Sequence, residues 1–231
     1  MVEIRDIDIP RDDLAEMLGG GFPSSSLGIV EGRYGTGKSV FTQRLTYGFL
    51  ENDYDVSVIS TELTVKGFIE QMDSLGYKIT SHLLNHDLLF IPIYGMMQQE
   101  AKENYVEKLM QGKRIFESDI IIVDTFSALV NKDENPKGAL KRLESFTQRL
   151  LGQGKTILLT IEPGPSTEEI FPPFYSTAHL LFELDLNQVG GTVSQEINVK
   201  RFAKAGSGVS QTISFRVEPG IGFVLEITSV G

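Results

Sequence analysis

The sequence predicts a three-layer α/β/α fold, in which helices cover both faces of a mostly parallel central sheet that ends in C-terminal antiparallel strands. Three observations lead to this prediction. Residues 27–50 read as a buried strand, a glycine-rich turn and a helix. Short β-branched runs then alternate with helical patterns, as in sheets built from βαβ units. From His179 onward, strands and glycine-containing turns follow one another without helices.

Composition limits the class of protein. The length and the 41% hydrophobic content suit one domain over residues 1–231. A net charge of −10 without any Lys/Arg run argues against a nucleic-acid partner. The lack of cysteine excludes disulfides and thiolate metal sites, and the first residues lack a signal-peptide pattern, which together favour a cytoplasmic protein. No uncharged apolar window is long enough to span a bilayer.

The N-terminal residues 1–26 are expected to form a short helix and a loop into the first core strand. The helix should end at the triple glycine 19–21, because glycine commonly terminates helices. A flexible arm is the alternative interpretation.

The turn inside residues 27–50 carries a phosphate-binding pattern. Gly32–Ser39 reads GRYGTGKS and fits G-x-x-x-x-G-K-[ST] at every required position. Such glycines let backbone N–H groups turn inward, and the positive end of the following helix attracts phosphates. Lys38 is expected to reach the β- and γ-phosphates, and the Ser39 hydroxyl to bind Mg²⁺. A glycine-rich turn that happens to contain a lysine is the alternative.

The middle of the chain is predicted to alternate strands and helices. A buried strand over 55–60 leads into Glu62, and an amphipathic helix over 64–75 follows. A strand over 88–94 should lie at a sheet edge or be short, because it contains Pro92, and a charged helix is expected over 100–116.

A second chemical signal follows the apolar strand 120–123. Asp124 ends this strand in the Walker-B arrangement, in which the carboxylate accepts from the water shell of Mg²⁺ beside the loop serine. An ordinary turn aspartate is the alternative, but the complete phosphate loop upstream favours the Walker-B role.

The C-terminal half is predicted to add one helix and then only strands. The helix runs from Asn135–Pro136 to Leu151, and a buried strand covers 156–161. Four strands are expected in an antiparallel extension of the sheet, at 180–186, 197–202, 213–217 and 223–227. His82, His86 and His179 have no metal-ligand spacing and are treated as structural or surface residues.

Five segments together resemble the RecA/KaiC family of ATPases: LGGGFP at 18–23, EGRYGTGKS at 31–39, STE at 60–62, VDT at 123–125 and ISFRVEPGIG at 213–222. Within that family, STELT, QRLTYGFL and FRVEPGIG are similar to the accessory ATP-binding proteins of the archaellum, the archaeal flagellum. The resemblance covers nearly the whole chain, and it implies a RecA-like core that binds ATP and Mg²⁺.

The resemblance also implies an assembly. It suggests a homo-hexameric ring at the membrane-associated base of the motor, in the cytoplasm. The implied partners are the motor ATPase, the polytopic membrane platform protein and a scaffold ring protein, so that any membrane contact is made through partners.

Carried over residue by residue, Gly35, Thr36, Gly37, Lys38 and Ser39 bind phosphate and Mg²⁺, and Asp124 is the Walker-B aspartate. Glu62 matches the RecA-type carboxylate that orients the attacking water, a role that also suits a carboxylate at the end of a strand. A residue favoured by the helix dipole is the alternative for Glu62.

Two departures from the family pattern argue against fast hydrolysis. KaiC-like rings use a basic K-x-R on a late strand to reach the neighbouring subunit's phosphates, whereas this chain has Lys200, Arg201 and Lys204. Adjacent residues of a strand face opposite ways, so only one of Lys200 and Arg201 can point at that site. Glu162 stands where many ATPases have a neutral polar residue, and an acid there would repel a γ-phosphate unless its side chain faces away.

Three functions stay open at this level. The first is a nucleotide-gated ring that docks and regulates the motor ATPase with slow or no hydrolysis. The second is an active ATPase that uses Glu62 as the base, and the third is a recombinase-like DNA-dependent ATPase, against which the negative charge argues.

Overall fold

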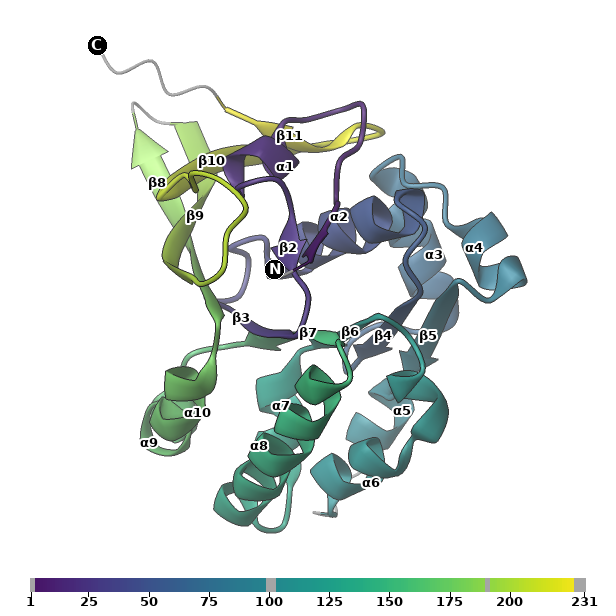
Figure 1. The fold of residues 1–231 in the computed structure, drawn as a ribbon, viewed down its shortest axis with the longest axis vertical. Helices are drawn as coiled ribbons and strands as arrows, with labels where there is room; N and C mark the ends of the chain where they lie inside the picture. Colours follow the sequence, from purple (N-terminus) through teal and green to yellow (C-terminus); the bar gives the residue numbers. More distant parts are fainter. Residues whose placement is uncertain (1–2, 99–102, 190–191, 227–231) are drawn as a thin grey trace.

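A central mixed sheet organises the computed structural model, which describes residues 3–98, 103–189 and 192–226 (Figure 1). Within these residues the sheet has the order β11-β10-β9-β8-β3-β7-β6-β4-β5. Its strands are β3 (Ser26–Gly32), β4 (Val56–Ser60), β5 (Leu88–Pro92), β6 (Ile120–Asp124), β7 (Thr156–Ile161), β8 (Leu180–Val189), β9 (Thr192–Phe202), β10 (Thr212–Glu218) and β11 (Gly222–Leu225). Strands β3 to β8 pair in parallel, and β8 to β11 pair antiparallel.

Helices cover both faces of this sheet, which confirms the predicted three-layer α/β/α fold. The first core cluster lies under α1 (Leu14–Met17), α2 (Lys38–Glu51), α3 (Val65–Ser74) and α4 (Thr80–Asn85). The second lies under α5 (Tyr94–Met97), α6 (Tyr105–Gln111), α7 (Phe126–Lys132), α8 (Pro136–Gly152), α9 (Pro165–Ile170) and α10 (Pro172–Thr177). The parallel strands are buried on both sides, as their continuous apolar runs predict.

Local sequence signals account for several element ends. The Thr64 side chain accepts a hydrogen bond from the Gly67 N–H at the start of α3. Asn135 caps α8 in the same way, with Pro136 in the first turn. Strand β5 is an edge strand, one of the two outcomes expected from Pro92, since proline has no N–H to donate to a neighbouring strand.

The predicted helix over 100–116 is wrong as one element. Residues 100–102 lie outside the described residues, and the rest forms α6 and a separate 3₁₀ turn, η1 (Lys113–Phe116). The break lies at Gly112, where a Cβ would stand 2.6 Å from Cδ1 of Ile115. The close return of the chain lets Ile115 enter the second core cluster, so tertiary packing overrides the helical pattern.

The C-terminal extension also differs in detail from the prediction. Strand β8 runs parallel to β3, so the antiparallel part of the sheet begins with β9. The predicted end of the last strand, residue 227, lies outside the described residues. Several short elements were not predicted, namely α4, α5, α7, α9, α10 and the two-stranded sheet of β1 (Ile4–Arg5) and β2 (Phe22–Pro23).

The N-terminal segment is tied to the body of the molecule and is not a free arm. The Arg5 guanidinium donates to the carbonyl oxygens of Asp119 and Gly154 at distances of 2.6 and 2.8 Å. Farther along, the Arg44 and Asp12 side chains form an ion pair with 0% and 2% exposure. This pair joins the segment to α2, the helix that follows the phosphate loop.

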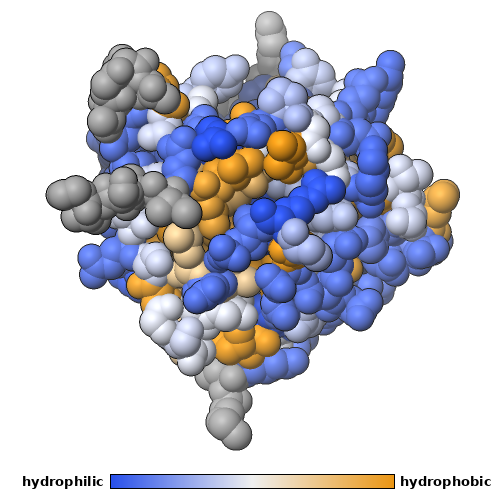
Figure 2. Space-filling model, turned by 90° about the horizontal axis from the view of Figure 1, so that it is seen from above, coloured by the Kyte–Doolittle hydropathy of each residue, from blue (hydrophilic) through white to orange (hydrophobic). Residues whose placement is uncertain are grey.

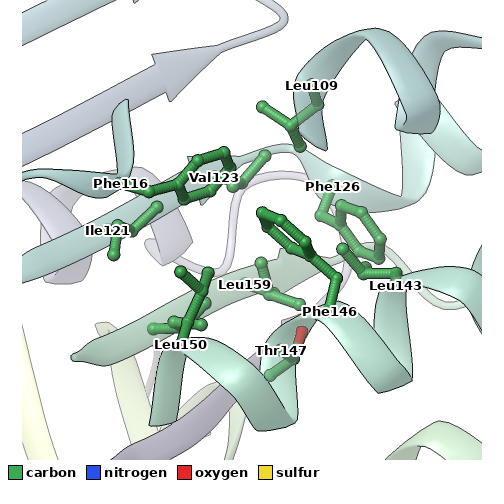
Figure 3. A pocket seen from close by; sticks show the side chains of 11 residues that line it. Leu109, Phe116, Ile121, Val123, Phe126, Leu143, Phe146, Thr147, Leu150 and Leu159 are labelled. Carbon is green, nitrogen blue, oxygen red and sulfur yellow. The ribbon is translucent and has the colours of Figure 1, made fainter. Parts of the chain in front are cut away.

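An apolar cavity lies within the second core cluster, between the sheet and α8 (Figure 3). Its labelled side chains point toward one another from β6, β7, α6, η1, α7 and α8, and the Thr147 hydroxyl is the polar group among them. Such a cavity suits packing and offers nothing to a phosphate.

Seen from above, the molecule is largely hydrophilic at its rim, with apolar side chains gathered in a hollow near the centre (Figure 2). Three partly buried residues in and just before the last two strands, Val209, Val217 and Leu225, pack against the first core cluster. None of the described helices is long and apolar enough to cross a bilayer.

Candidate nucleotide-binding site

The phosphate loop connects the end of β3 to the start of α2. Gly35 and Gly37 have φ angles of +83° and +93°, which only glycine adopts without strain. A Cβ on Gly37 would also lie 2.8 Å from Cζ of Phe215. The two glycines therefore allow the loop to turn, and Gly37 also leaves room for β10 to approach closely. The first N–H groups of α2 can then bind an anion.

The Lys38 side chain lies inside this loop. Its Nζ donates to the carbonyl oxygens of Gly32 and Arg33 at 2.6 and 2.9 Å, and the residue is 8% exposed. Burial lowers the pKa of the Lys38 ammonium, and the nearby carboxylates of Glu162, Asp124 and Glu62 partly offset that shift. The ammonium is thus held inside the loop, where a bound polyphosphate would lie.

Asp124 lies at the carboxyl end of β6, next to the loop. Its Oδ1 accepts from the Thr160 hydroxyl at 2.7 Å, and the Ser39 hydroxyl lies near the same carboxylate. Burial raises the pKa of Asp124, and the charge of Glu62 adds to the rise, while the Thr160 and Ser39 hydroxyls and the Lys38 ammonium oppose it. The structure therefore joins the loop serine to the strand-end aspartate, as the Walker-A and Walker-B patterns predict.

Glu62 approaches the same place from the neighbouring strand. Residues Ser60 and Asp124 are directly paired in the register of β4 and β6, so the segments after them emerge side by side. The Thr125 hydroxyl donates to Oε1 of Glu62 at 2.8 Å, and the Thr125 N–H donates to the Thr61 hydroxyl at 3.0 Å. Glu62 itself is exposed, so its carboxylate can meet solvent and a ligand together.

One cavity collects most of these groups. It is lined by Tyr34, Gly35, Gly37, Lys38, Ser39, Val40, Glu62, Thr125, Glu162, Gln195 and Val217. The predicted Thr36 lies beneath the loop at 3% exposure, where its hydroxyl donates to the Arg33 carbonyl oxygen at 2.8 Å. Asp124 lies behind Ser39 at 6% exposure.

Several residues of this site were missed by sequence reasoning. The contact of Thr125 with Glu62 could have been predicted, since Thr125 directly follows the Walker-B aspartate. Thr160, Gln195 and Val217 carry no local signal, because strand order alone brings β7, β9 and β10 toward the loop.

The three candidate bases lie apart from the cavity. Lys200 pairs with Glu183 at 2.8 Å. Arg201 donates to the carbonyl oxygens of Ala178 and Tyr175 at the end of α10, at 2.6 and 3.1 Å. Lys204 is exposed in the turn after β9 with a φ of +65°. Lys200 and Arg201 are thus engaged within their own chain.

Glu162 does reach the cavity, as the sequence suggested. It follows β7, and its N–H donates to the Ser127 hydroxyl at 2.9 Å, which fixes the start of the segment that leads into α9. Of the three carboxylates that raise the pKa of Lys38, Glu162 has the largest effect. Three acidic side chains, Glu62, Asp124 and Glu162, therefore surround one lysine.

Comparisons with known proteins agree with this geometry. The family description of the KaiC ATPases matches residues 11–201. A relative from Methanocaldococcus jannaschii, named archaeal flagellar ATP-binding protein FlaH, is 38% identical over 231 residues, which is 100% of this chain and 99% of the relative. The chain belongs to the KaiC-type ATPases and, among them, to the FlaH family. The predicted resemblance is thereby confirmed.

Further FlaH relatives and solved structures extend the match. FlaH from Methanococcus voltae is 34% identical, and FlaH from Sulfolobus acidocaldarius is 28% identical, with coverage of 97% and 94% of both chains. The crystal structure of the flagellar accessory protein FlaH from M. jannaschii superimposes with a TM-score of 0.91 at 37% identity, over 98% of this chain and 100% of that one. A KaiC-like protein from Pyrococcus horikoshii, with a TM-score of 0.76 at 18% identity over the same shares, supports the fold alone.

Proposed function

We propose that residues 1–231 act as one ATP-binding domain of the archaellum motor, a nucleotide-gated ring that docks and regulates the motor ATPase with slow or no hydrolysis. The observation that carries this proposal is the cavity at the phosphate loop, where Lys38 and Ser39 meet Glu62 from the strand next to Asp124. Membership of a family whose members are named archaeal flagellar ATP-binding proteins supports the placement in the archaellum.

The loop residues take defined roles in this proposal. Gly35, Thr36 and Gly37 shape the cradle, whose N–H groups bind the phosphate oxygens. Lys38 exchanges its two carbonyl partners for the β- and γ-phosphates, which restores a counter-charge to a buried ammonium. Binding therefore costs little reorganisation of the chain.

The donor set fits Mg²⁺. Among the described residues, no group of three or more His, Cys, Asp or Glu side chains is arranged as a metal cage. Mg²⁺ at nucleotide sites is commonly held by one or two protein oxygens together with phosphates and water, and Ser39 and Asp124 offer such oxygens side by side. When bound, the ion would neutralise charge on the phosphates, and Ser39 and Asp124 would orient it.

Charge balance supports slow turnover. In the transition state of phosphoryl transfer, cationic groups must stabilise the equatorial oxygens. Here Glu62 and Glu162 line the same cavity as Lys38, and Lys200 and Arg201 are held by Glu183 and by the carbonyl oxygens at the end of α10. One chain alone is therefore short of positive charge for catalysis.

Glu62 favours the second candidate, an active ATPase. It is exposed, it is oriented by the Thr125 hydroxyl, and it lies beside the Walker-B aspartate, which are the requirements for a residue that positions an attacking water. A neighbouring subunit's base would have to complete such a site.

The ring and its partners belong to the same proposal. The resemblance to the family suggests a homo-hexamer in the cytoplasm, at the base of the motor. It also suggests three partners: the motor ATPase, the membrane platform protein and the scaffold ring protein. ATP would act as a gate if it binds the assembled state better than the single chain.

The decisive experiment compares the native protein, Lys38→Ala and Glu62→Gln by titration with Mg·ATP and by phosphate release. Lys38→Ala should abolish binding with little effect on melting temperature, because Nζ contacts only loop carbonyls. Glu62→Gln should bind ATP normally, and phosphate release should be slow in both binding-competent proteins. Unchanged ATP affinity in Lys38→Ala would refute the site, and fast release that depends on Glu62 would establish the active ATPase.

A further inference from the structure

The antiparallel end of the sheet has one face that none of the described helices covers. The second core cluster, which lies under α5 to α10, reaches Leu181 on β8 and includes no described residue of β9, β10 or β11. In Figure 1, α9 and α10 lie below the hairpin of β8 and β9, which rises away from them. Alternate side chains of these strands therefore stand on an open sheet face.

Carboxylates gather on this open face, next to the phosphate loop. Glu31 of β3 is directly paired with Glu183 of β8. Two residues further along β8, Asp185 is directly paired with Glu196 of β9. Paired residues and alternate residues share one side of a sheet, so these four carboxylates, here called the acidic face, stand on the same side. Like charges that stand opposite each other destabilise a sheet.

Only part of this negative charge is balanced within the chain. Lys200 pairs with Glu183 at 2.8 Å. Among the described residues, no cationic side chain forms an ion pair with Glu31, Asp185 or Glu196. Burial raises the pKa of the Glu31 carboxyl, and the charges of Glu183 and Asp185 add to the rise. A cationic partner would relieve this repulsion.

A cavity of about 490 Å³ opens beside the acidic face and the phosphate loop. Three of the four carboxylates line it, and Arg33 is the one cation among its described lining residues. Two large side chains at the same cavity are strongly exposed, Tyr34 at 87% and Leu186 at 51%. Exposed aromatic and aliphatic groups beside a charged hollow suit a protein surface that carries cations, because such a surface would cover the apolar groups as well.

The same chain carries a basic surface on α8 and η1. The Phe116 ring of η1 and the Phe146 ring of α8 have centroids 4.8 Å apart, so the two elements form one surface. These elements hold a single carboxylate, Glu144, although the whole chain has a net charge of −10. Five exposed cations without an ion pair among the described residues, here called the basic face, lie on them: Lys113, Arg114, Lys141, Arg142 and Arg149.

Helix α9 lies between these two faces of one chain. The charge of its Glu168 reaches Glu31, and its Glu169 pairs with Lys137 of α8 at 2.9 Å. We propose that the acidic face binds the basic face of a second copy of this chain, so that successive copies join head to tail. Two different surfaces meet in such a contact, and its closure gives a ring. The inference rests on the proposed function and deepens it, because it names the surfaces that hold the ring together.

The test reverses the charge of each face in the full chain and follows the light-scattering mass with Mg·ATP. Asp185→Lys/Glu196→Lys reverses the acidic face, and Arg142→Glu/Arg149→Glu reverses the basic face. Each variant should assemble at least about tenfold more weakly than the native protein at about 0.1 M salt, because like charges then meet at the contact. An equimolar mixture of the two variants should assemble again, because each reversed face finds its complement on the other variant.

Controls separate a lost contact from a lost fold. Every variant should keep its ATP affinity, since none of the substituted residues lines the nucleotide cavity. Glu70→Lys/Asp73→Lys is the matched control, because it makes the same change of charge on exposed residues of α3, outside both faces, and should leave the mass unchanged. If the reversed acidic face does not fold, the neutral Asp185→Asn/Glu196→Gln carries the test and should weaken assembly about threefold.

The outcomes separate this inference from the proposed function. Unchanged assembly after either reversal, or a mixture that stays dissociated, would overturn the inference and leave gating by ATP intact. A native protein that assembles equally without nucleotide, yet responds to both reversals as expected, would support the inference and refute the gating. A native protein that remains a single chain with Mg·ATP bound would overturn both.

Discussion

The ion pair between Asp12 and Arg44 gives a sharp prediction about stability. The Arg44 Nε and Nη2 donate to Oδ2 and Oδ1 of Asp12 at 2.7 and 2.8 Å, and Nη1 donates to the Ile7 carbonyl oxygen at 3.0 Å. Both side chains are almost completely buried. Asp12→Ala would therefore leave a guanidinium charge buried on α2 with a single carbonyl partner.

Asp12→Ala should lower the free energy of unfolding strongly, because the buried Arg44 guanidinium would lose the carboxylate that compensates its desolvation. Removing one partner of a buried pair costs about 3–5 kcal/mol of unfolding free energy. For a chain of this size that corresponds to a fall of roughly 6–20 °C in melting temperature. Asp12→Asn should cost less, because an amide oxygen can still accept from Arg44 and from the Leu14 N–H that Asp12 now caps at 3.0 Å.

The assay is thermal and urea unfolding of the native protein and the two Asp12 variants. Glu70→Ala is the matched control, since the Lys66–Glu70 pair is exposed and contributes no more than about 0.5 kcal/mol. The double variant Asp12→Leu/Arg44→Met should recover most of the loss, because apolar side chains can replace a buried pair. A melting temperature for Asp12→Ala within about 2 °C of the native value would refute this reasoning.

Two other predictions concern the nucleotide site and pH. Asp124→Asn should weaken ATP binding in the presence of Mg²⁺ more than in EDTA, because the lost carboxylate faces Ser39; isothermal titration checks this, and equal losses would indicate misfolding instead. His179 Nδ1 accepts from the Leu27 N–H at 3.3 Å, and burial, with the charges of Lys204 and Arg201, lowers the pKa of this imidazole below its usual 6.5. The unfolded chain therefore takes up the proton first, so stability is complete above about pH 6.5 and declines as the pH falls below it. His179→Gln keeps an acceptor without the titration, and urea unfolding between pH 5 and 8 should show a weaker decline; identical pH profiles would contradict the assignment.

The parts of the molecule that local patterns specify were predictable. The phosphate loop, Asp124 at the end of its strand, the Thr64 and Asn135 caps and the edge position of β5 all depend on residue type and spacing. The structure also joins Ser39 to Asp124, which lie far apart in the sequence, because β3 and β6 flank β7 and end at the same edge of the sheet.

Features that depend on tertiary packing were not predictable. The break at Gly112 lets Ile115 become buried. The segment of α9 and α10 packs Phe171 and Phe174 against Phe126, although its sequence has no clear helical period. Gln195 has no signal of its own, since only the pairing of β9 with β10 turns it toward the loop. Lys200 and Arg201 were considered as alternative bases, and the sequence did not indicate that Glu183 and the end of α10 hold them.

The most direct test of the central proposal is the light-scattering mass of the purified protein with and without Mg·ATP, with phosphate release followed on the same sample. We predict growth from a single chain of 25.6 kDa to a ring on addition of Mg·ATP, with slow or no release, and no growth for Lys38→Ala. A mass that is the same with and without nucleotide, in a protein that binds ATP, would contradict nucleotide gating.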